Sequence, residues 1–236
     1  WVLLMEIDFN EQGKVSFRTF LIFSFFLLIV LNIGFLLNSS YFRVSKVEVV
    51  GSNEIFKEKE LIKPALGQSI WLINSDTFSN ELLQTPTIEK VIIEKEYPNK
   101  ITIELTQYDK ILSITDLRSS VPKKSILYKN MVETKSDKIL NMPTLTITNG
   151  PVPVGFNGEM VSLIMTLKSY NLDTNAFNFI YDGSSFIGEY RDTVIDFGKP
   201  LDLGSKSSAL GSLLENSKCA GEISFISKED VIANCS

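Results

Sequence analysis

The residues of this chain that could carry out chemistry are few, because the sequence contains no histidine and only two cysteines. Without histidine there is no Ser-His-Asp triad, no Cys-His pair and no His-Glu-x-x-His zinc site. Ser120 and Lys123 match the Ser-x-x-Lys nucleophile motif, but they lie in a proline-containing turn without a Lys-Thr-Gly or Ser-Asp-Asn companion. No glycine-rich phosphate loop or metal-ligand spacing occurs either. The sequence therefore predicts a protein without catalytic residues, metal or cofactor.

An enzyme of this composition would have to work with carboxylates, lysines, hydroxyls or a borrowed metal, and the chain has 28 acidic residues. A pair of them could cleave a glycosidic bond, so a membrane-anchored cell-wall hydrolase is an alternative function. No cluster stands out: two aspartates of the second half bracket a predicted strand, and two lie near predicted turns, where local hydrogen bonding by aspartate is common. Asp192 and Asp196 bracket the strand, and Asp173 and Asp182 lie near the turns.

Cys219 and Cys235 lie close together near the end of the sequence. Outside the cytoplasm they could form a disulfide, which would stabilise the fold by about 3 kcal/mol in the chain-entropy estimate for a loop of this length. Two unpaired thiols are the alternative, because bond geometry cannot be read from sequence. A thiol titration of the denatured, unreduced protein distinguishes them.

An uncharged apolar segment dominates the first part of the chain, from Thr19 to Leu37. As a helix it would reach roughly 28 Å, enough to cross the hydrocarbon core of a bilayer. A cleaved signal peptide would end in small residues, whereas Leu36 to Ser40 make a poor cleavage site. We expect a cytoplasmic tail over 1–18, a transmembrane helix over 19–37 and an extracytoplasmic body thereafter. Flanking charges do not decide this orientation, but a single early anchor before a large soluble body is the usual layout of a translocated domain.

The overall charge and composition exclude further classes. The net charge is −5 and 44% of the residues are hydrophobic. Without a basic surplus, the chain is not expected to bind nucleic acid. The composition is otherwise that of an ordinary globular protein.

Residues 42–109 show the pattern of a small domain with the order β-α-α-β-β. Gly67 is expected to close the first helix, Ser75 or Asp76 to cap the second, and residues 97–100 to form a hairpin turn. The predicted elements are strand 44–50, helix 57–66, helix 76–84, strand 88–95 and strand 101–105.

Residues 110–236 predict a second, mixed domain. Its predicted strands are 111–116, 125–128, 144–148, 177–181, 186–191, 193–197 and a final strand from 222 that continues through 232. Its predicted helices are 158–170 and 207–216.

Several motifs of the first domain are those of a POTRA domain. They are Val47-x-Val49-x-Gly51-x-Asn53, Gly67 with Trp71-Leu72, Pro86 before a strand, the Tyr97-Pro98 turn, and Ile101-x-Ile103-x-Leu105. A POTRA domain directly after one membrane helix resembles the bacterial cell-division family FtsQ/DivIB. One departure is Gln107-Tyr108-Asp109-Lys110, where the family often has Glu-Arg-x-Pro. The resemblance implies an α+β chain in which a "β domain" follows the POTRA domain.

The resemblance also implies a function. The chain would be a non-enzymatic scaffold of the divisome in the plasma membrane at the division septum. It would bind FtsL-like and DivIC/FtsB-like proteins, with the septal transpeptidase as a further candidate partner. By position, a late edge strand of the β domain would contact these partners, and an exposed edge can accept a partner strand. The candidate residues are Glu222, Ile223, Ser224, Phe225, Ile226, Val231 and Ile232.

Two alternatives to this contact and function stay open. The strand could be internal, or the charges of residues 228–230 could prevent a partner strand from pairing with it. A POTRA-bearing export or outer-membrane assembly component is the other functional alternative, although 127 residues after the POTRA domain are too few for a large barrel.

Overall fold

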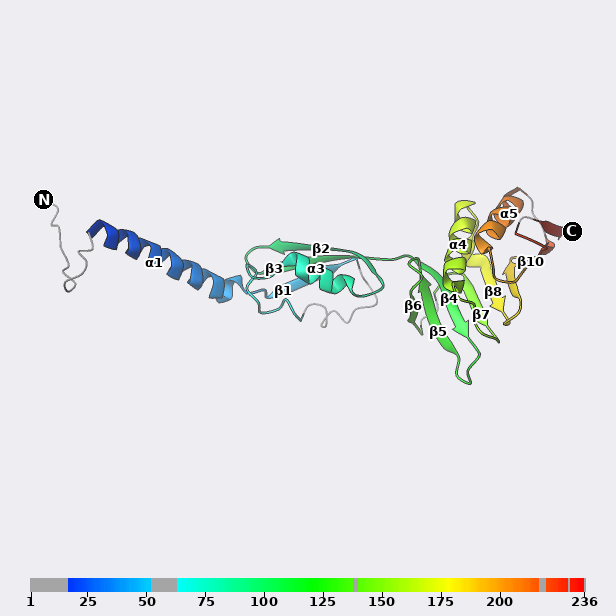
Figure 1. Cartoon of the computed structure of the whole chain (residues 1–236), viewed down its shortest axis with the longest axis horizontal. Coiled ribbons are helices and arrows are strands. Elements are labelled where there is room, and N and C mark those ends of the chain that lie inside the picture. Colours follow the sequence, from blue (N-terminus) through cyan, green and yellow to red (C-terminus); the bar gives the residue numbers. More distant parts are fainter. Residues whose placement is uncertain (1–16, 52–62, 138–139, 217–219, 229, 236) are drawn as a thin grey trace. The chain divides into compact units, whose positions relative to one another are not determined.

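The computed structural model describes residues 17–51, 63–137, 140–216, 220–228 and 230–235. The chain divides into two compact units between Gln107 and Tyr108. The first unit comprises residues 1–107 and the second comprises residues 108–236 (Figure 1).

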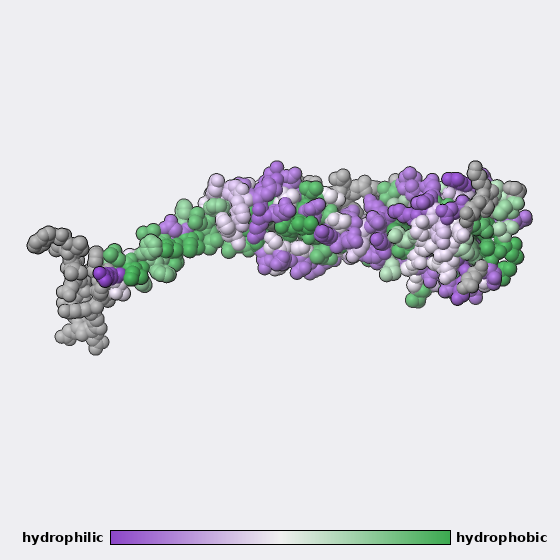
Figure 2. Space-filling model, turned by 90° about the horizontal axis from the view of Figure 1, so that it is seen from above, coloured by the Kyte–Doolittle hydropathy of each residue, from purple (hydrophilic) through white to green (hydrophobic). Residues whose placement is uncertain are grey.

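The predicted apolar segment forms helix α1, Phe17–Asn38. Its span from Arg18 to Asn38 is long and apolar enough to cross a membrane, and none of its most hydrophobic stretch is buried in the protein (Figure 2). The Asn32 side-chain amide donates to the carbonyl of Leu28 at 2.7 Å, and that of Asn38 donates to Gly34 at 3.1 Å. The helix backbone therefore satisfies donors of these two polar side chains, as a low-dielectric environment demands.

The first unit continues with a three-stranded sheet and one described α-helix. Strand β1 (Lys46–Val50) pairs in parallel with β3 (Lys100–Gln107), which pairs antiparallel with β2 (Ile88–Glu96). A short 3₁₀ turn, η1 (Ser40–Phe42), precedes β1, and helix α3 spans Ser75–Leu83. Its core consists of Val44, Ala65, Ile70, Ile73, Phe78, Leu82, Ile88, Ile101, Ile103 and Leu105.

The two helices predicted for this unit, 57–66 and 76–84, have different outcomes. Most of the predicted helix 57–66 lies outside the described residues, and its described end forms turns before Gly67, which has a positive φ of 80°. The cap of α3 was predicted one or two residues too late. The Asn74 side chain accepts the backbone N–H groups of Asp76 and Thr77, because asparagine at this position reaches both donors of the first turn.

The second unit is built on one nine-stranded sheet in the order β12-β11-β10-β9-β8-β7-β4-β5-β6. Helices α4 (Phe156–Ser169) and α5 (Leu203–Asn216) pack side by side against this sheet (Figure 1). The strands are β4 (Lys110–Asp116), β5 (Lys123–Tyr128), β6 (Glu133–Lys135), β7 (Thr144–Ile147), β8 (Phe177–Tyr181), β9 (Phe186–Tyr190), β10 (Thr193–Gly198), β11 (Gly221–Phe225) and β12 (Val231–Cys235), with the 3₁₀ turn η2 (Thr174–Ala176) before β8. The α+β fold class is thereby confirmed.

Aromatic rings fill the core beneath α4 and α5. Phe197 lies 5.2 Å from Phe186 and 5.5 Å from Phe225 between ring centroids, and the latter pair is stacked. Phe179 stacks on Phe186 at 5.4 Å. Gly188 permits this approach, since a Cβ there would lie 3.0 Å from Phe197. The alternating strands thus place their large side chains on one face, as the sequence pattern predicts.

Helix α5 begins four residues before its predicted start at Ser207. Leu203 is fully buried, and its N–H donates to the Glu159 carboxylate of α4 at 2.7 Å. The Lys206 ammonium donates to the carbonyls of Phe197 and Lys199 at 2.6 and 3.0 Å, and burial lowers the pKa of this lysine. These contacts are tertiary, so the local pattern could not indicate them.

The end of the chain differs from the single final strand that was predicted. Residues 221–225 and 231–235 form two antiparallel strands, β11 and β12, with Phe225 opposite Val231. The Ser227 hydroxyl donates to the Asp230 carboxylate at 2.8 Å, and the Asp230 N–H donates back to Ser227 at 3.0 Å. A local hydrogen-bonded turn therefore reverses the chain where the sequence suggested a continuation.

Candidate partner-binding edge

Strand β12 forms one end of the nine-stranded sheet in the described part of the chain. Its inner neighbour, β11, pairs in parallel with β10 on the other side. The N–H of Gly221 donates toward β10, to the carbonyl of Asp192, and the N–H of Ile226 donates toward β12, to the carbonyl of Asp230. Because backbone groups alternate along a strand, Glu222 and Ser224 also face β12.

The same alternation assigns the direction of each backbone group in β12. Ser224 lies opposite Ile232 and Glu222 opposite Asn234, so Ile232 and Asn234 direct their backbone groups to β11. The N–H and C=O groups of Val231, Ala233 and Cys235 consequently point away from the sheet. This row is the template that an added partner strand would require.

The side chains of β12 alternate between the two faces of the sheet. Ala233 lies opposite Ile223, which is completely buried, and Val231 packs against the core with Phe225. Ile232 lies on the opposite face and is 58% exposed. An added strand could therefore gain backbone hydrogen bonds together with one apolar contact at Ile232.

The structure separates the predicted edge residues into two groups. Glu222, Ile223, Ser224 and Phe225 belong to β11, which is not an edge because it pairs on both sides; their assignment to an edge strand was wrong. Ile226 lies in the turn region and is exposed, while Val231 and Ile232 belong to the terminal strand β12. Binding of a partner at this strand stays a prediction.

Sequence reasoning missed Ala233 and Asn234, which continue the same edge. The one available signal was the apolar run Val231-Ile232-Ala233, whose first two residues the prediction joined to the preceding strand. The charges of residues 228–230 lie before β12 and not within it.

Gly221 allows β12 to approach its neighbour. A Cβ at Gly221 would lie 2.1 Å from the backbone oxygen of Asn234, and its φ is 147°. We expect Gly221→Ala to destabilise the β11–β12 pair by about 1–3 kcal/mol, the usual cost of overpacking against atoms that cannot move aside. Hydrogen exchange should accelerate in residues 231–235. Gly198→Ala is the matched control, since Gly198 also has a positive φ but no atom lies within 4 Å of its Cβ position; unchanged exchange in Gly221→Ala would contradict the expectation.

Cys235 ends β12 and is disulfide-bonded. Cys219 lies outside the described residues, so the Cys219–Cys235 pairing stays a prediction. Such a bond would fasten the edge strand to the segment that follows α5.

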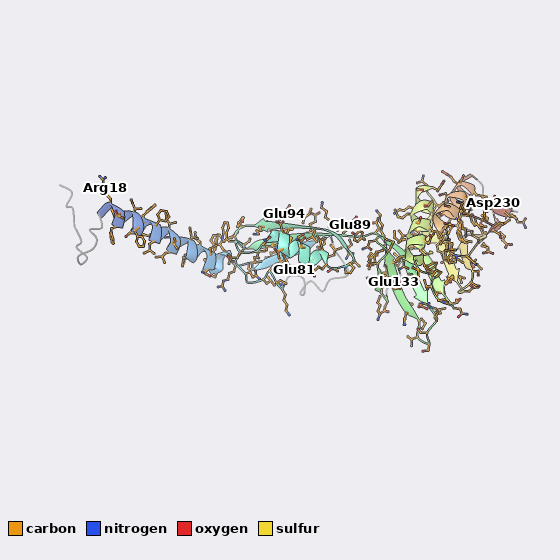
Figure 3. All side chains as sticks on the ribbon, viewed as in Figure 1. Arg18, Glu81, Glu89, Glu94, Glu133 and Asp230 are labelled. Carbon is orange, nitrogen blue, oxygen red and sulfur yellow. The ribbon has the colours of Figure 1, made fainter. Side chains whose placement is uncertain are left out.

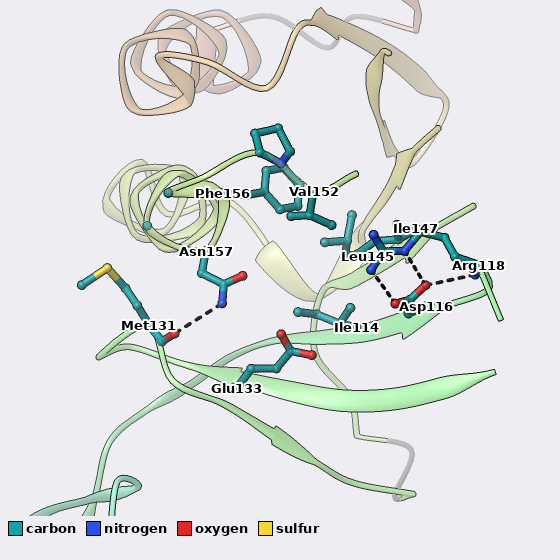
Figure 4. A pocket seen from close by; sticks show the side chains of 13 residues that line it. Ile114, Asp116, Arg118, Met131, Glu133, Leu145, Ile147, Val152, Phe156 and Asn157 are labelled. Carbon is teal, nitrogen blue, oxygen red and sulfur yellow. Dashed lines mark hydrogen bonds and ion pairs between the residues drawn. The ribbon is translucent and has the colours of Figure 1, made fainter. Parts of the chain in front are cut away.

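A second feature of this unit is a cleft of about 540 Å³ between the start of α4 and strands β4, β6 and β7 (Figure 4). Its walls are largely apolar, and Asp116, Arg118 and Glu133 supply the charges. The described lining residues include no serine, threonine, cysteine or lysine nucleophile. The carboxylates of Asp116 and Glu133 are therefore the acidic groups that face the described cleft.

The charges of the cleft are paired with neighbours. Arg118 donates to both oxygens of Asp116, at 2.9 Å from Nε and 2.7 Å from Nη2, and donates to the carbonyl of Gly150 at 3.0 Å. The Ser125 hydroxyl donates to Glu133. The Arg118 guanidinium lowers the pKa of Asp116 to about 2, so this carboxylate is ionised at neutral pH and cannot act as a general acid there.

This pairing predicts a defined acid response. The folded-state pKa of Asp116 lies below the unfolded value, so its contribution to stability is present above about pH 4. That contribution should be lost as the pH falls through about 2. In an NMR titration of the side-chain carboxyl carbon, the Asp116 midpoint should lie near pH 2 and rise toward 4 in Arg118→Gln. A midpoint that does not move in this variant would exclude the guanidinium as the cause.

The other catalytic candidates do not converge. Ser120 is exposed in a bend, and Lys123 is an exposed residue at the start of β5, opposite Asp116. Glu81, Glu89 and Glu94 are spread over the first unit (Figure 3). Across the described residues, no group of three or more acidic or cysteine side chains could hold a metal ion.

Three aspartates of the second unit bond locally. Asp173 accepts the N–H of Asn175, and Asp196 accepts the N–H of Gly198. Asp182 accepts the N–H groups of Ser185 and Ser184, and these bonds hold the pKa of Asp182 well below its usual range. The turn interpretation of Asp173 and Asp182 agrees with the structure.

Comparison with known proteins bears on the first unit. The family described as "POTRA domain, FtsQ-type" matches residues 42–108. These residues are a POTRA domain of the FtsQ type. The matched residues thus comprise β1, α3, β2 and β3, together with Phe42 of η1 and the undescribed segment after Gly51.

A relative extends this similarity. The chain is 26% identical over 115 residues to "Cell division protein DivIB" of Geobacillus kaustophilus (strain HTA426). The match covers 48% of this chain and 44% of that protein, so it spans less than half the length of the relative. Together with the FtsQ-type POTRA domain, it confirms the resemblance to the FtsQ/DivIB family.

Proposed function

We propose that this chain is a non-enzymatic, single-pass membrane protein of the bacterial division machinery. The observation that carries the proposal is an FtsQ-type POTRA domain that begins four residues after a helix able to span a membrane. The similarity to a DivIB protein supports the same role. In this proposal α1 anchors the chain in the plasma membrane, and both following units lie outside the cytoplasm at the division septum.

We further propose that the second unit links division proteins through strand β12. The support is physical: β12 ends the sheet, its outward backbone groups form a row, and Ile232 adds an exposed apolar side chain. FtsL-like and DivIC/FtsB-like proteins are the partners that the family resemblance suggests. A partner segment would enter in an extended conformation and extend the sheet by one strand.

Localisation of a fluorescent fusion at the N-terminal end tests the division role. Enrichment at midcell, dependent on the division machinery, is the expected result. A uniform signal around the cell envelope would contradict the proposal. Purified extracytoplasmic units should not degrade peptidoglycan, and turnover of that polymer would favour the hydrolase alternative.

A further inference from the structure

An exposed aromatic cluster lies at one end of the POTRA domain. Ring centroids of Tyr41 and Phe42 are 5.1 Å apart, those of Phe42 and Trp71 are 5.5 Å apart, and those of Trp71 and Tyr97 are 4.6 Å apart. Leu72 follows Trp71 and is exposed as well. We call these five residues the aromatic end. The four aromatic rings form one continuous chain although they come from three separate segments.

The fold brings these three segments together at the end of the domain where α1 enters. Arg43 forms an antiparallel bridge with Ser69, and the N–H of Ile70 donates to the carbonyl of Phe42 at 2.8 Å. The N–H of Ser45 donates to the carbonyl of Asn99 at 3.0 Å. Residues 69–72 and the β2–β3 turn are therefore fixed beside the start of β1.

The aromatic end is unusually exposed for residues of this kind. Tyr41 is 63% exposed, Trp71 47%, Leu72 67% and Tyr97 54%. Of the five residues, Phe42 alone packs against the core of the unit. Such a contiguous apolar and aromatic surface indicates a binding surface, because water solvates it poorly.

Distance along the chain restricts what can cover this surface. Tyr41 follows Asn38, the last residue of α1, by three residues, which span at most about 10 Å. If α1 crosses the bilayer, the aromatic end is tethered at the level of the lipid headgroups. Tyrosine and tryptophan are enriched in that layer, because their rings are apolar while their O–H and N–H groups still reach water.

We propose that the aromatic end inserts into the interfacial layer of the bilayer that α1 spans. The lipid interface is then a second membrane contact of the protein, made by the POTRA domain and not by the helix. This contact rests on the proposed membrane anchoring. The three chain segments of the aromatic end then contact the bilayer in addition to the tether at α1. These contacts restrain the orientation of the POTRA domain on the membrane.

Trp71 provides a direct test, because the chain has two tryptophans and Trp1→Phe leaves Trp71 as the sole reporter. The full chain is reconstituted at one copy per lipid nanodisc, with bromine on the acyl chains either near the glycerol backbone or near the chain ends. Trp71 emission should be quenched most by the shallow bromines and should be shifted to shorter wavelength. Leu72→Ser should reduce this quenching.

The control places the reporter at the other end of the same domain. Leu83 is 41% exposed at the end of α3, next to the start of β2 and away from the β2–β3 turn. In Trp1→Phe/Trp71→Phe/Leu83→Trp, neither bromolipid should quench. Leu83→Ser should leave Trp71 quenching unchanged, and circular dichroism verifies that each variant is folded.

The outcomes separate this inference from the anchoring on which it rests. Failure of the chain to float with vesicles at alkaline pH would overturn the membrane anchor itself. A chain that floats but whose Trp71 is not quenched would overturn only the interfacial contact. A short-wavelength emission without quenching would mean that protein covers Trp71, and stronger quenching by the deep bromines would place it in the hydrocarbon core; both contradict the proposal.

Discussion

Replacing Ala233 by proline is expected to weaken binding of a DivIC/FtsB-like partner at least about tenfold, while the unfolding temperature of the second unit changes by only a few degrees. The inferred N–H of Ala233 points away from β11, so proline removes a donor that the sheet itself does not use. An added partner strand would lose that hydrogen bond and would meet the proline ring. A loss of about 1.4 kcal/mol of binding free energy already corresponds to tenfold.

The matched control removes the same kind of group from the opposite end of the sheet. At the other edge, the hydrogen bonds Tyr128–Val132 and Lys124–Ser136 show that Val132 and Ser136 direct their backbone groups to β5. Because backbone groups alternate along a strand, the N–H of Lys135 in β6 points away from the sheet. Lys135→Pro should leave the dissociation constant unchanged in the same binding assay, such as calorimetry with the purified partner. Equal binding by Ala233→Pro and the parent chain would exclude pairing at β12, though not the relation to DivIB.

Replacing Phe197 by alanine is expected to lower the free energy of unfolding of the second unit by about 3–5 kcal/mol, the cost of deleting a large ring from a packed core. The Phe197 side chain is fully buried and contacts the rings of Phe179, Phe186 and Phe225. Because domains are stable by only about 5–15 kcal/mol, this change removes a large part of the total. It should also disturb β11, since Phe225 loses its stacking partner.

Urea denaturation of residues 39–236 can resolve the two units. Trp71 is the single tryptophan of this fragment and reports on the first unit, whereas circular dichroism reports on both. Phe197→Ala should shift the dichroism transition and leave the tryptophan transition in place. Ile226→Ala, at a 71% exposed position, should change the unfolding free energy by less than about 0.5 kcal/mol. A common shift of both signals would show that the units unfold together.

Local sequence patterns predicted much of the fold, because the spacing of apolar residues within one strand or helix is a local property. The alternation in Ile101-x-Ile103-x-Leu105 gave strand β3, and the spacing of Met160, Leu163 and Leu167 gave helix α4. Strand β6 was missed because three residues are too short for a periodic signal. The turn at 227–230 was missed because its Ser227–Asp230 bonds use neither glycine nor proline, the residues that usually mark a reversal.

The candidate edge could be predicted only in part for a different reason. Whether a strand is internal depends on which strands flank it, and sheet order is a property of the whole unit. Ile223 and Ile232 are both isoleucines of the predicted final strand, yet Ile223 is fully buried in β11 and Ile232 is exposed in β12. The close approach at Gly221 and the ring contacts of Trp71 likewise join residues that are distant in sequence.

The two edges of the nine-stranded sheet differ, and this difference affects how many partner strands the sheet can accept. The β12 end offers five residues with an exposed isoleucine, whereas the β6 end offers three residues whose exposed side chains are the charged Glu133 and Lys135. Charged and very short edges resist strand addition. If β12 is the receptive edge of the described nine-stranded sheet, this sheet would accept a strand at that edge and would not be extended from β6, so it would not join end to end into fibres.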